Sequence, residues 1–236
     1  MRLLFTLQYL GTRYAGWQTQ ANATGVQSVV EERLSTVFGT TVRVEGAGRT
    51  DSGVHARAQR AHADVPFAIG ARGLRRGLND LLPWDIRVTG IETVDDRFHC
   101  RFAAKAKTYV YRICNSEVAD VFTAETHAHV AQPLDAARMH AVAQALAGTH
   151  DFTPFTVIAP EVSSTTRTIA RIEVARGGDT VSVTVTADGF LRYMVRRIAG
   201  SLIEIGRGKV AAEAIWTEAR WTAPAKGLTL WEIEYS

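Results

Sequence analysis

Cysteine and long apolar runs are scarce in this sequence, and each absence argues against a class of protein. The two cysteines, Cys100 and Cys114, form no CxxC pair, which argues against a disulfide framework or a four-thiolate zinc site and favours a reducing compartment. No apolar stretch is long enough to span a membrane, and the first residues lack the apolar run of a signal peptide. We therefore expect a soluble, cytoplasmic chain.

Signatures of nucleotide cofactors and hydrolases are also missing. There is no G-x-S-x-G, the glycines at 46 and 48 lack the third glycine of a dinucleotide fingerprint, and Lys209 is followed by valine where a phosphate loop requires Ser or Thr. Four histidines of the second half lack metal-site spacing and are interpreted as surface or half-buried residues: His127, His129, His140 and His150. We expect no metal and no organic cofactor.

The composition is that of an ordinary globular protein. Of 236 residues, 46% are hydrophobic and 22% are charged, which suits one large domain or two small ones. Lys and Arg number 27 against 24 Asp and Glu, so the net charge is +3. That balance permits a nucleic-acid partner without requiring one.

Hydrophobic periodicity predicts the same order of elements in each half: strand, helix, strand, strand, helix, strand. In the first half the elements are expected at 3–9, 26–38 (with a capping box from Thr24 to Gln27), 42–44, 57–65, 71–81 and 86–91. In the second half they are expected at 109–113, 139–146, 168–176, 181–185, 191–205 and 231–235, with a further helix near 210–221. This is the split βαβ arrangement, repeated once. The predicted fold class is α+β, with two ferredoxin-like halves at 1–104 and 105–236.

The segment from Gly48 to His55 is the densest in chemistry. Its glycines allow positive φ and a close approach of a ligand to the backbone, while Arg49 and Asp51 stand two residues apart. An ionised Asp51 in a cleft can act as a nucleophile or a base, and a nearby arginine keeps it charged. The alternative is a tight loop with a local Arg–Asp pair.

Basic residues gather in two segments. Six arginines oppose two acids between Arg49 and Arg76, and five bases oppose Glu204 between Arg192 and Lys209. A solvated helix face is the usual explanation of such a run; the functional alternative is two basic patches, one in each half, that face a shared phosphate-binding groove. Tyr109 and Tyr111 lie among lysines and an arginine, as base stacking requires, but Tyr111 also fits a core position.

Several segments in their joint order resemble the TruA-type family of tRNA pseudouridine synthases, over nearly the whole chain. The quoted segments are 11–20 (GTRYAGWQTQ), 47–56 (AGRTDSGVHA), 98–102 (FHCRF), 107–111 (KTYVY), 151–155 (DFTPF), 190–196 (FLRYMVR) and 227–230 (GLTL). Three positions depart from the family pattern. Ser52 and Cys100 each stand where alanine is usual, and Leu10 stands where an acidic residue commonly precedes the first glycine.

The resemblance implies an isomerase that acts on uridine in the anticodon stem-loop of tRNA, at positions 38, 39 and 40. The family's catalytic carboxylate falls on Asp51, and the loop arginine that holds the flipped base falls on Arg49. The tyrosine against the target base falls on Tyr109, and the arginine that supports the carboxylate falls on Arg196. The resemblance also implies two ferredoxin-like halves that form a pseudouridine synthase fold with a central cleft, and a homodimer without a cofactor.

Two alternatives from other classes remain open at this point. A non-catalytic RNA-binding protein with the same repeated unit would explain the bases and aromatics, but it would leave the Asp51 loop without a role. A metal-dependent hydrolase would retain a metal ion through purification.

Overall fold

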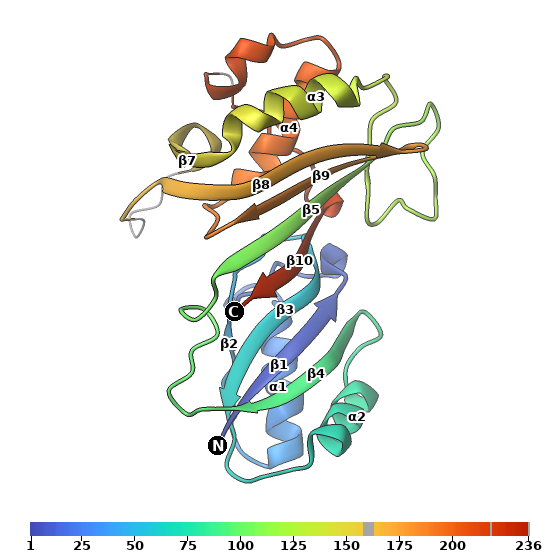
Figure 1. The fold of residues 1–236 in the computed structure, drawn as a ribbon. Helices are drawn as coiled ribbons and strands as arrows, with labels where there is room; N and C mark the ends of the chain where they lie inside the picture. Colours follow the sequence, from blue (N-terminus) through green and yellow to red (C-terminus); the bar gives the residue numbers. More distant parts are fainter. Residues whose placement is uncertain (158–162, 218, 236) are drawn as a thin grey trace. The chain divides into compact units, whose positions relative to one another are not determined.

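The computed structural model describes residues 1–157, 163–217 and 219–235. These residues form two compact units (Figure 1). Unit 1 comprises Met1–Lys105 together with the end of the chain from Leu230, and unit 2 runs from Ala106 to Thr229. Both units combine strands with helices, so the predicted α+β class is confirmed. In the part of the chain that is described, no helix has the length and apolar character that a membrane crossing requires.

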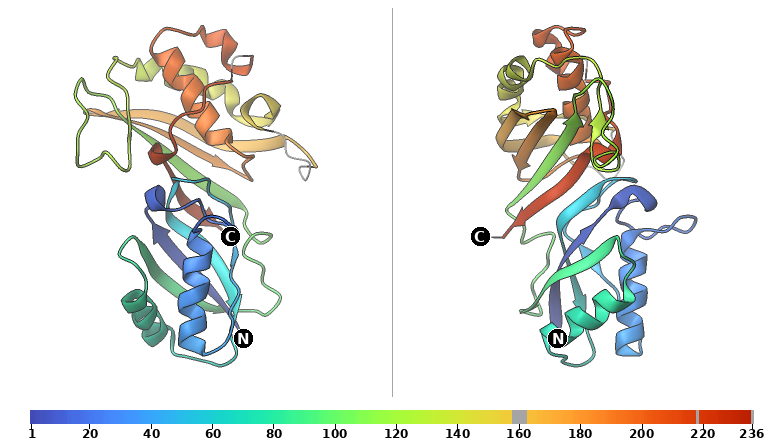
Figure 2. Two further views of the ribbon diagram at one scale, coloured as in Figure 1. Left: turned by 180° about the vertical axis from the view of Figure 1, so that it is seen from behind. Right: turned by 90° about the vertical axis from the view of Figure 1, so that its right-hand side faces the viewer.

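Unit 1 is a β-sheet with two helices. Its elements are β1 (Arg2–Tyr9), α1 (Val26–Phe38), β2 (Glu45–Gly46), β3 (His55–Asp64), α2 (Ala71–Leu81), β4 (Ile86–Val94) and the end of β10 (Leu228–Glu234). The strand order is β4-β1-β3-β10, with β2 paired to β3. Leu3 lies between Ala63 of β3 and Thr93 of β4, so β1 is a central strand. The views in Figure 2 show α1 and α2 on one face of this sheet.

The helices of unit 1 follow from the spacing of their apolar residues. Val26, Val30, Leu34 and Phe38 are buried along one side of α1, and the helix ends at Gly39 with a φ of 65°. Leu74 and Leu78 are buried in the same way on α2. Both predicted helices are confirmed with their predicted limits.

The predicted capping box of α1 and the predicted strand before the Asp51 loop need correction. Gly25 is the N-cap of α1, and no side chain caps it. The Gln27 side chain bonds to other segments of the same chain instead. Its Nε2 donates to the carbonyl of Val44 at 2.8 Å, and its Oε1 accepts from the backbone amide of Thr19 at 3.0 Å. The strand that was expected from Val42 begins only at Glu45. A tertiary contact has replaced the local capping box.

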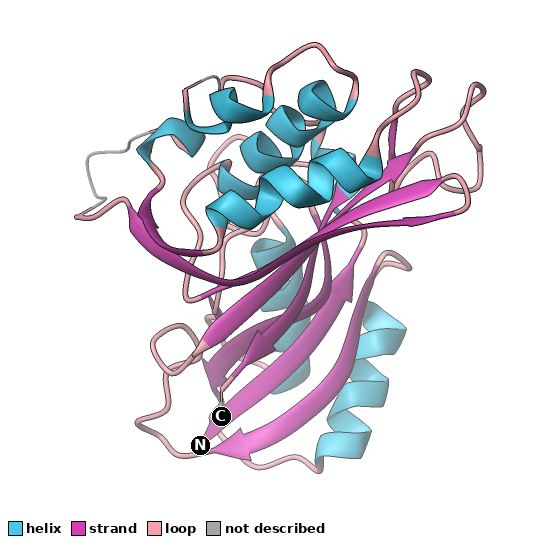
Figure 3. Cartoon of the chain, turned by 45° about the horizontal axis from the view of Figure 1, so that its top comes forward, coloured by secondary structure: helices cyan, strands magenta, loops and turns pink. Residues whose placement is uncertain are grey.

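Unit 2 is a layer of paired strands covered by helices on one face (Figure 3). Its elements are β5 (Ala106–Cys114), β6 (Ala128–His129), α3 (Ala136–Ala143), β7 (Gly148–Asp151), β8 (Thr166–Gly177), β9 (Thr180–Ala187) and α4 (Met194–Gly206). The strand order is β5-β9-β8-β7, and β6 runs parallel to the end of β5. The predicted hairpin is confirmed, with Gly177 paired to Thr180 and Gly178 at a φ of 60°.

The core of unit 2 lies between this sheet and α3 and α4. Val181, Val183 and Val185 of β9 are fully buried, as their alternation predicts. Met139 of α3 and Ile198 of α4 are also fully buried. The predicted helix from residue 191 begins at Met194, after a break at Tyr193.

The helix predicted near 210–221 is wrong over most of its length. Among the described residues of that segment, only Ala212–Trp216 is helical, and it forms a 3-10 turn. The following chain lies against α4: the amide of Ala223 donates to the carbonyl of Arg196 at 3.0 Å. A Cβ on Gly200 would lie 2.2 Å from the carbonyl oxygen of Trp221, so a helical glycine admits this close approach. Packing on α4 therefore overrides the helix propensity of the alanines.

Candidate active site

The Asp51 loop, defined here as residues 47–54, connects β2 to β3 in unit 1. Thr50 is buried, while Arg49 is exposed and Asp51 is half-buried. The arginine and the carboxylate are therefore both accessible, on either side of a buried anchor. These two predicted site residues lie in one loop, as their separation of two residues in the sequence requires.

The first half of the loop is held by the sheet beneath it. The amide of Ala47 donates to the carbonyl of Arg60 at 2.7 Å, and Gln59 Nε2 donates to the carbonyl of Gly48 at 2.7 Å. The hydroxyls of Thr50 and Tyr9 lie 2.8 Å apart in the interior. Burial raises the pKa of Tyr9 to about 12, so its phenol stays neutral at the pH of the cell. These contacts fix the backbone on both sides of Arg49.

The second half of the loop is held by the segment from Gly11 to Trp17. Trp17 donates its amide to the carbonyl of Thr50 at 3.1 Å, and Gly53 donates its amide to the carbonyl of Tyr14 at 3.3 Å. Gly16 has a φ of 90°, and a Cβ there would lie 2.4 Å from the carbonyl oxygen of Thr50. Only glycine combines this backbone conformation with this approach. The Gly11–Trp17 segment is therefore a support for Asp51 in space, although it lies more than thirty residues earlier in the chain.

A buried polar pair anchors that support. Tyr14 donates its hydroxyl to Asp85 at 2.7 Å, and the Asp85 carbonyl accepts the amide of Leu10 at 3.0 Å. Burial, together with this bond to a carboxylate, raises the pKa of Tyr14. Asp85 just precedes β4, so three separate segments converge on one loop. Neither Tyr9 nor Asp85 stands near the loop in the sequence, so no sequence pattern indicated that they support it.

Tyr109 lies in unit 2, on β5. It is 7% exposed, and its ring meets Phe190 edge to face at a centroid distance of 4.9 Å. Tyr111, two residues further along the strand, is fully buried and donates its hydroxyl to the carbonyl of Pro224 at 2.9 Å. The core interpretation of Tyr111 is confirmed.

Arg196 lies in the first turn of α4, also in unit 2. Its Nε donates to the carbonyl of Ala223 at 2.9 Å, and its guanidinium carbon lies 5.3 Å from the centre of the Tyr193 ring. Arg192 lies 4.9 Å from the same ring. Tyr193 has a φ of 63° and is the one residue other than glycine with positive φ in the described ranges. Such strain is typical of positions that orient functional groups, and no sequence signal indicated it.

The two basic segments are less available than their sequence suggested. Arg60 pairs with Glu92 at 2.9 Å, and Arg207 pairs with Glu204 at 2.6 Å. Arg197 donates to the carbonyls of Pro154 and Thr156. Exposed cations nevertheless remain in both segments: Arg49, Arg57, Arg72, Arg75, Arg76, Arg192 and Lys209. Some arginines of the two segments therefore serve the fold through ion pairs and hydrogen bonds, while others remain exposed to solvent.

Three of the four histidines singled out in the sequence make hydrogen bonds to the backbone. His129 and His150 donate to the carbonyls of Ser116 and Ala147, each at 2.8 Å, and His140 accepts from the amide of Val174 at 3.2 Å. Burial lowers the pKa of His127. Within residues 1–157, 163–217 and 219–235, none of the four belongs to a group of three metal ligands.

Comparison with a family model gives a match over most of the chain. The model is described as tRNA pseudouridine synthase, and it matches residues 6–103 and 142–236. The Asp51 loop, the Gly11–Trp17 segment and α4 all fall within the matched residues, whereas Tyr109 lies between the two ranges.

Comparison with curated proteins gives relatives that match over nearly the whole chain. A tRNA pseudouridine synthase A of Brevibacillus brevis is 42% identical over 242 residues, with 99% of each chain covered. The proteins of the same name from Nitrobacter hamburgensis and Bacillus pumilus are 40% and 39% identical, again over at least 99% of each chain.

Proposed function

This chain belongs to the tRNA pseudouridine synthase family, whose members are isomerases of uridine in tRNA, and from that premise we propose that Asp51 is its catalytic carboxylate. We propose that the target uridines lie in the anticodon stem-loop, at positions 38, 39 and 40. The observation that carries the assignment is the half-buried Asp51 in a loop held at several backbone positions, beside the exposed Arg49.

The reaction breaks the N1–C1′ bond of uridine, turns the uracil and joins C5 to C1′. No atom is gained or lost overall, so the reaction needs neither a redox cofactor nor a nucleotide. Asp51 either attacks the base or the sugar covalently, or removes a sugar proton to give an unsaturated intermediate. Both routes require an ionised carboxylate in a fixed position. The contacts of Thr50 with Tyr9 and Trp17 supply that fixation.

We assign Arg49 the role of stabilising tRNA after the target base has left the helix. A stacked base must leave the helix before its C5 and C1′ atoms can be reached, at a free-energy cost of a few kcal/mol. Arg49 is exposed and adjacent to the buried Thr50, so its guanidinium is able to occupy the vacated space and contact phosphate. That contact would offset part of the cost of extrusion.

Tyr109 and Arg196 are assigned to the target base and to the support of Asp51, respectively. Phe190 holds the Tyr109 ring edge to face, which leaves little rotational freedom for a stacking surface. Arg196 is held at its Nε by the Ala223 carbonyl, so the remaining guanidinium nitrogens keep a defined direction. Both roles stay predictions for this chain.

The working form is proposed to be a cytoplasmic homodimer that binds tRNA without a metal or organic cofactor in the reaction. A dimer gives a substrate as large as tRNA contacts on both subunits. The accessible arginines of unit 1 suit the phosphate backbone.

Release of tritium from tRNA labelled at C5 of uridine tests the catalytic assignment, because C5 loses its hydrogen in the reaction. Asp51→Asn keeps the size of the side chain and removes its charge; we expect release to fall to background while tRNA binding survives. Asp80→Asn, at an exposed carboxylate on α2, is the matched control and should release label at the normal rate. Normal release by Asp51→Asn would refute the assignment.

Mapping of pseudouridine in bulk tRNA, with and without the protein, tests the proposed positions. New pseudouridine is expected at 38, 39 and 40 only. Modification elsewhere, with Asp51 still essential, would refute the position and leave the catalytic residue in place.

A further inference from the structure

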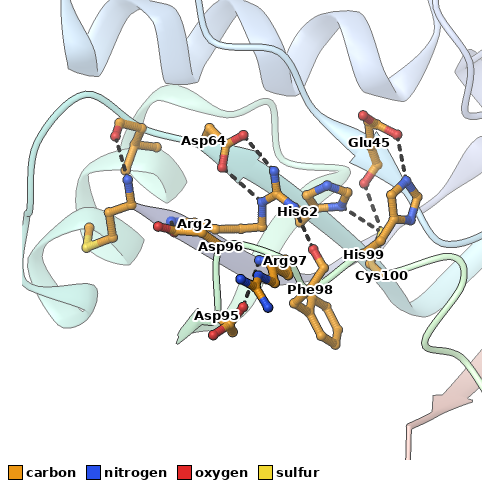
Figure 4. Close-up of polar contacts among 12 residues, drawn as sticks. Arg2, Glu45, His62, Asp64, Asp95, Asp96, Arg97, Phe98, His99 and Cys100 are labelled. Atoms are coloured by element: carbon orange, nitrogen blue, oxygen red, sulfur yellow. Dashed lines mark hydrogen bonds and ion pairs between the residues drawn. The ribbon is translucent and has the colours of Figure 1, made fainter.

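Two histidines and a cysteine meet in unit 1 (Figure 4). His62 lies on β3, while His99 and Cys100 lie in the turn after β4. One ligand atom from each of the three lies within 4.8 Å of the other two. None of them belongs to the Asp51 loop, and the proposed reaction uses none of them.

The contacts within this His62–His99–Cys100 cluster are specific. His62 Nδ1 lies 3.2 Å from Cys100 Sγ, and the thiol donates to the carbonyl of Glu45 at 3.2 Å. His99 donates its Nε2 hydrogen to the carboxylate of Glu45 at 3.1 Å. The rings of His62 and His99 lie 4.8 Å apart, edge to face. The cluster therefore has three potential ligands and an outer carboxylate that orients one of them.

The cluster is buried on one side and exposed to solvent on the other. Cys100 is fully buried and His62 is 4% exposed. The side chain of His99 is 27% exposed and that of Glu45 is 65% exposed. An ion thus has a path from solvent along Glu45 and His99 to the buried thiol.

We propose that His62, His99 and Cys100 bind one divalent metal ion of the zinc class, with Glu45 as an outer-shell carboxylate or a fourth ligand. Sulfur and imidazole nitrogen are the donors that zinc prefers, whereas magnesium and calcium prefer oxygen. Bond lengths of about 2.0–2.3 Å in a tetrahedral site place the ligand atoms about 3.3–3.6 Å apart. The distance of 3.2 Å between His62 Nδ1 and Cys100 Sγ is already close to that separation. Binding transfers the thiol proton to solvent, because the thiolate is the ligand.

The bound ion would tie three segments together. Glu45 lies on β2, His62 on β3 and Cys100 in the turn that follows β4. The Cys100 carbonyl also accepts the hydroxyl of Tyr235 at 2.9 Å, near the end of the chain. Since β2 leads directly into the Asp51 loop, the ion would stabilise the strand from which that loop departs. Its role is structural, and the inference stands whether or not Asp51 is the catalytic group.

Spectroscopy of the whole reduced, metal-free protein tests the site without any substitution. Titration with Co²⁺ is expected to produce a thiolate-to-cobalt charge-transfer band in the near ultraviolet that saturates at one ion per chain. Zn²⁺, added afterwards, should abolish the band and raise the midpoint of thermal unfolding. The absence of a charge-transfer band at saturating Co²⁺ would overturn the proposal.

Matched substitutions identify the thiol. In competition with a chromophoric chelator, Cys100→Ala is expected to weaken Zn²⁺ binding at least tenfold and to lose the cobalt band. Cys114→Ala, at the second buried cysteine, should retain both. Glu45→Gln is expected to weaken binding about tenfold to a hundredfold, as loss of an outer-shell partner does. Circular dichroism verifies that each variant is folded. Equal Zn²⁺ affinity in Cys100→Ala and the unsubstituted chain would overturn the proposal.

Discussion

At the scale of single residues, Gly16 shows how a position distant in sequence constrains the geometry of the Asp51 loop. Its positive φ and the 2.4 Å approach of the Thr50 carbonyl oxygen to an added Cβ are two separate demands. Gly39 also has positive φ but has open space around it. An alanine at Gly39 would therefore suffer backbone strain alone, whereas an alanine at Gly16 would suffer both strain and a steric clash.

We predict that Gly16→Ala reduces turnover by at least tenfold and lowers the free energy of unfolding by about 1–3 kcal/mol, because the added methyl group displaces Thr50 and with it Asp51. Gly39→Ala should lower stability by about 1–2 kcal/mol without changing turnover. Tritium release and urea denaturation measure the two effects. Normal turnover in Gly16→Ala would contradict a supporting role for the Gly11–Trp17 segment.

Arg196 provides a second prediction at this scale. If Arg196 positions Asp51, Arg196→Ala should lower kcat about tenfold to a hundredfold while tRNA affinity changes little. Arg192→Ala, which removes the other guanidinium from the Tyr193 ring, is the matched control. Salt dependence separates the two roles, since each lost phosphate contact reduces the slope of log affinity against log salt by about 0.7 on single strands. A normal kcat with a smaller slope would make Arg196 a phosphate contact.

At the scale of secondary-structure elements, Arg2 connects β1 to β3 and to the turn after β4. Its guanidinium donates to Asp64 at 2.7 and 2.9 Å and to the carbonyl of Phe98 at 2.7 Å. The bond from Arg2 lowers the pKa of Asp64. Asp64 is largely exposed to solvent, so the pair contributes modestly.

A lowered carboxylate pKa in the folded state gives a defined pH dependence. The stabilisation is fully present above the unfolded pKa of about 3.9 and is lost as pH falls through the lower folded pKa. We predict that Arg2→Met lowers the free energy of unfolding by about 0.2–1 kcal/mol at pH 7 through the loss of this pair, and that this difference from the parent narrows below pH 4. Urea denaturation from pH 7 to pH 2 measures it. In an Asp64→Asn background the pH-dependent part should vanish; if it persists, another group is responsible.

The elements also show the limit of local rules. Most helices and strands with an apolar stripe were found where the spacing placed them, because burial of a regular face requires regular spacing, although the strand expected from Val42 begins only at Glu45. The capping box at Thr24 and the helix near 210–221 failed for a common reason. In both segments a polar group bonds to a partner distant in sequence. The Gln27 side chain donates to the carbonyl of Val44, and the Ala223 amide donates to the carbonyl of Arg196. Local helix propensity does not depend on such distant partners and therefore cannot predict them.

At the scale of the whole molecule, the C-terminal segment of the chain returns to unit 1. The amide of Lys105 donates to the carbonyl of Glu234 at 2.8 Å, Arg57 lies 4.8 Å from the ring of Trp231, and Tyr235 bonds to Cys100. The last strand, from Leu230 onward, thus belongs to a unit whose other residues precede Ala106.

We predict that deletion of residues 230–236 destabilises unit 1 selectively. Amide hydrogen exchange should rise in β3 and in the turn at 98–105, whereas exchange in the β8–β9 hairpin should stay unchanged. Comparison with the full chain by mass spectrometry measures both regions at once. A uniform rise over the whole chain would mean that the end of the chain supports the fold globally.

The sequence by itself determined the α+β class, the order of most elements and the Asp51 loop, because periodic burial and glycine-rich turns are encoded locally. The family resemblance assigned roles to Asp51, Arg49, Tyr109 and Arg196. Only the tertiary structure decided what surrounds them: the Tyr9, Trp17 and Tyr14 contacts of the loop, the strained Tyr193, and the His62–His99–Cys100 cluster. Side-chain spacing specifies which face of an element is buried, but not which distant face it meets. That choice depends on packing and on hydrogen bonds between segments far apart in the chain.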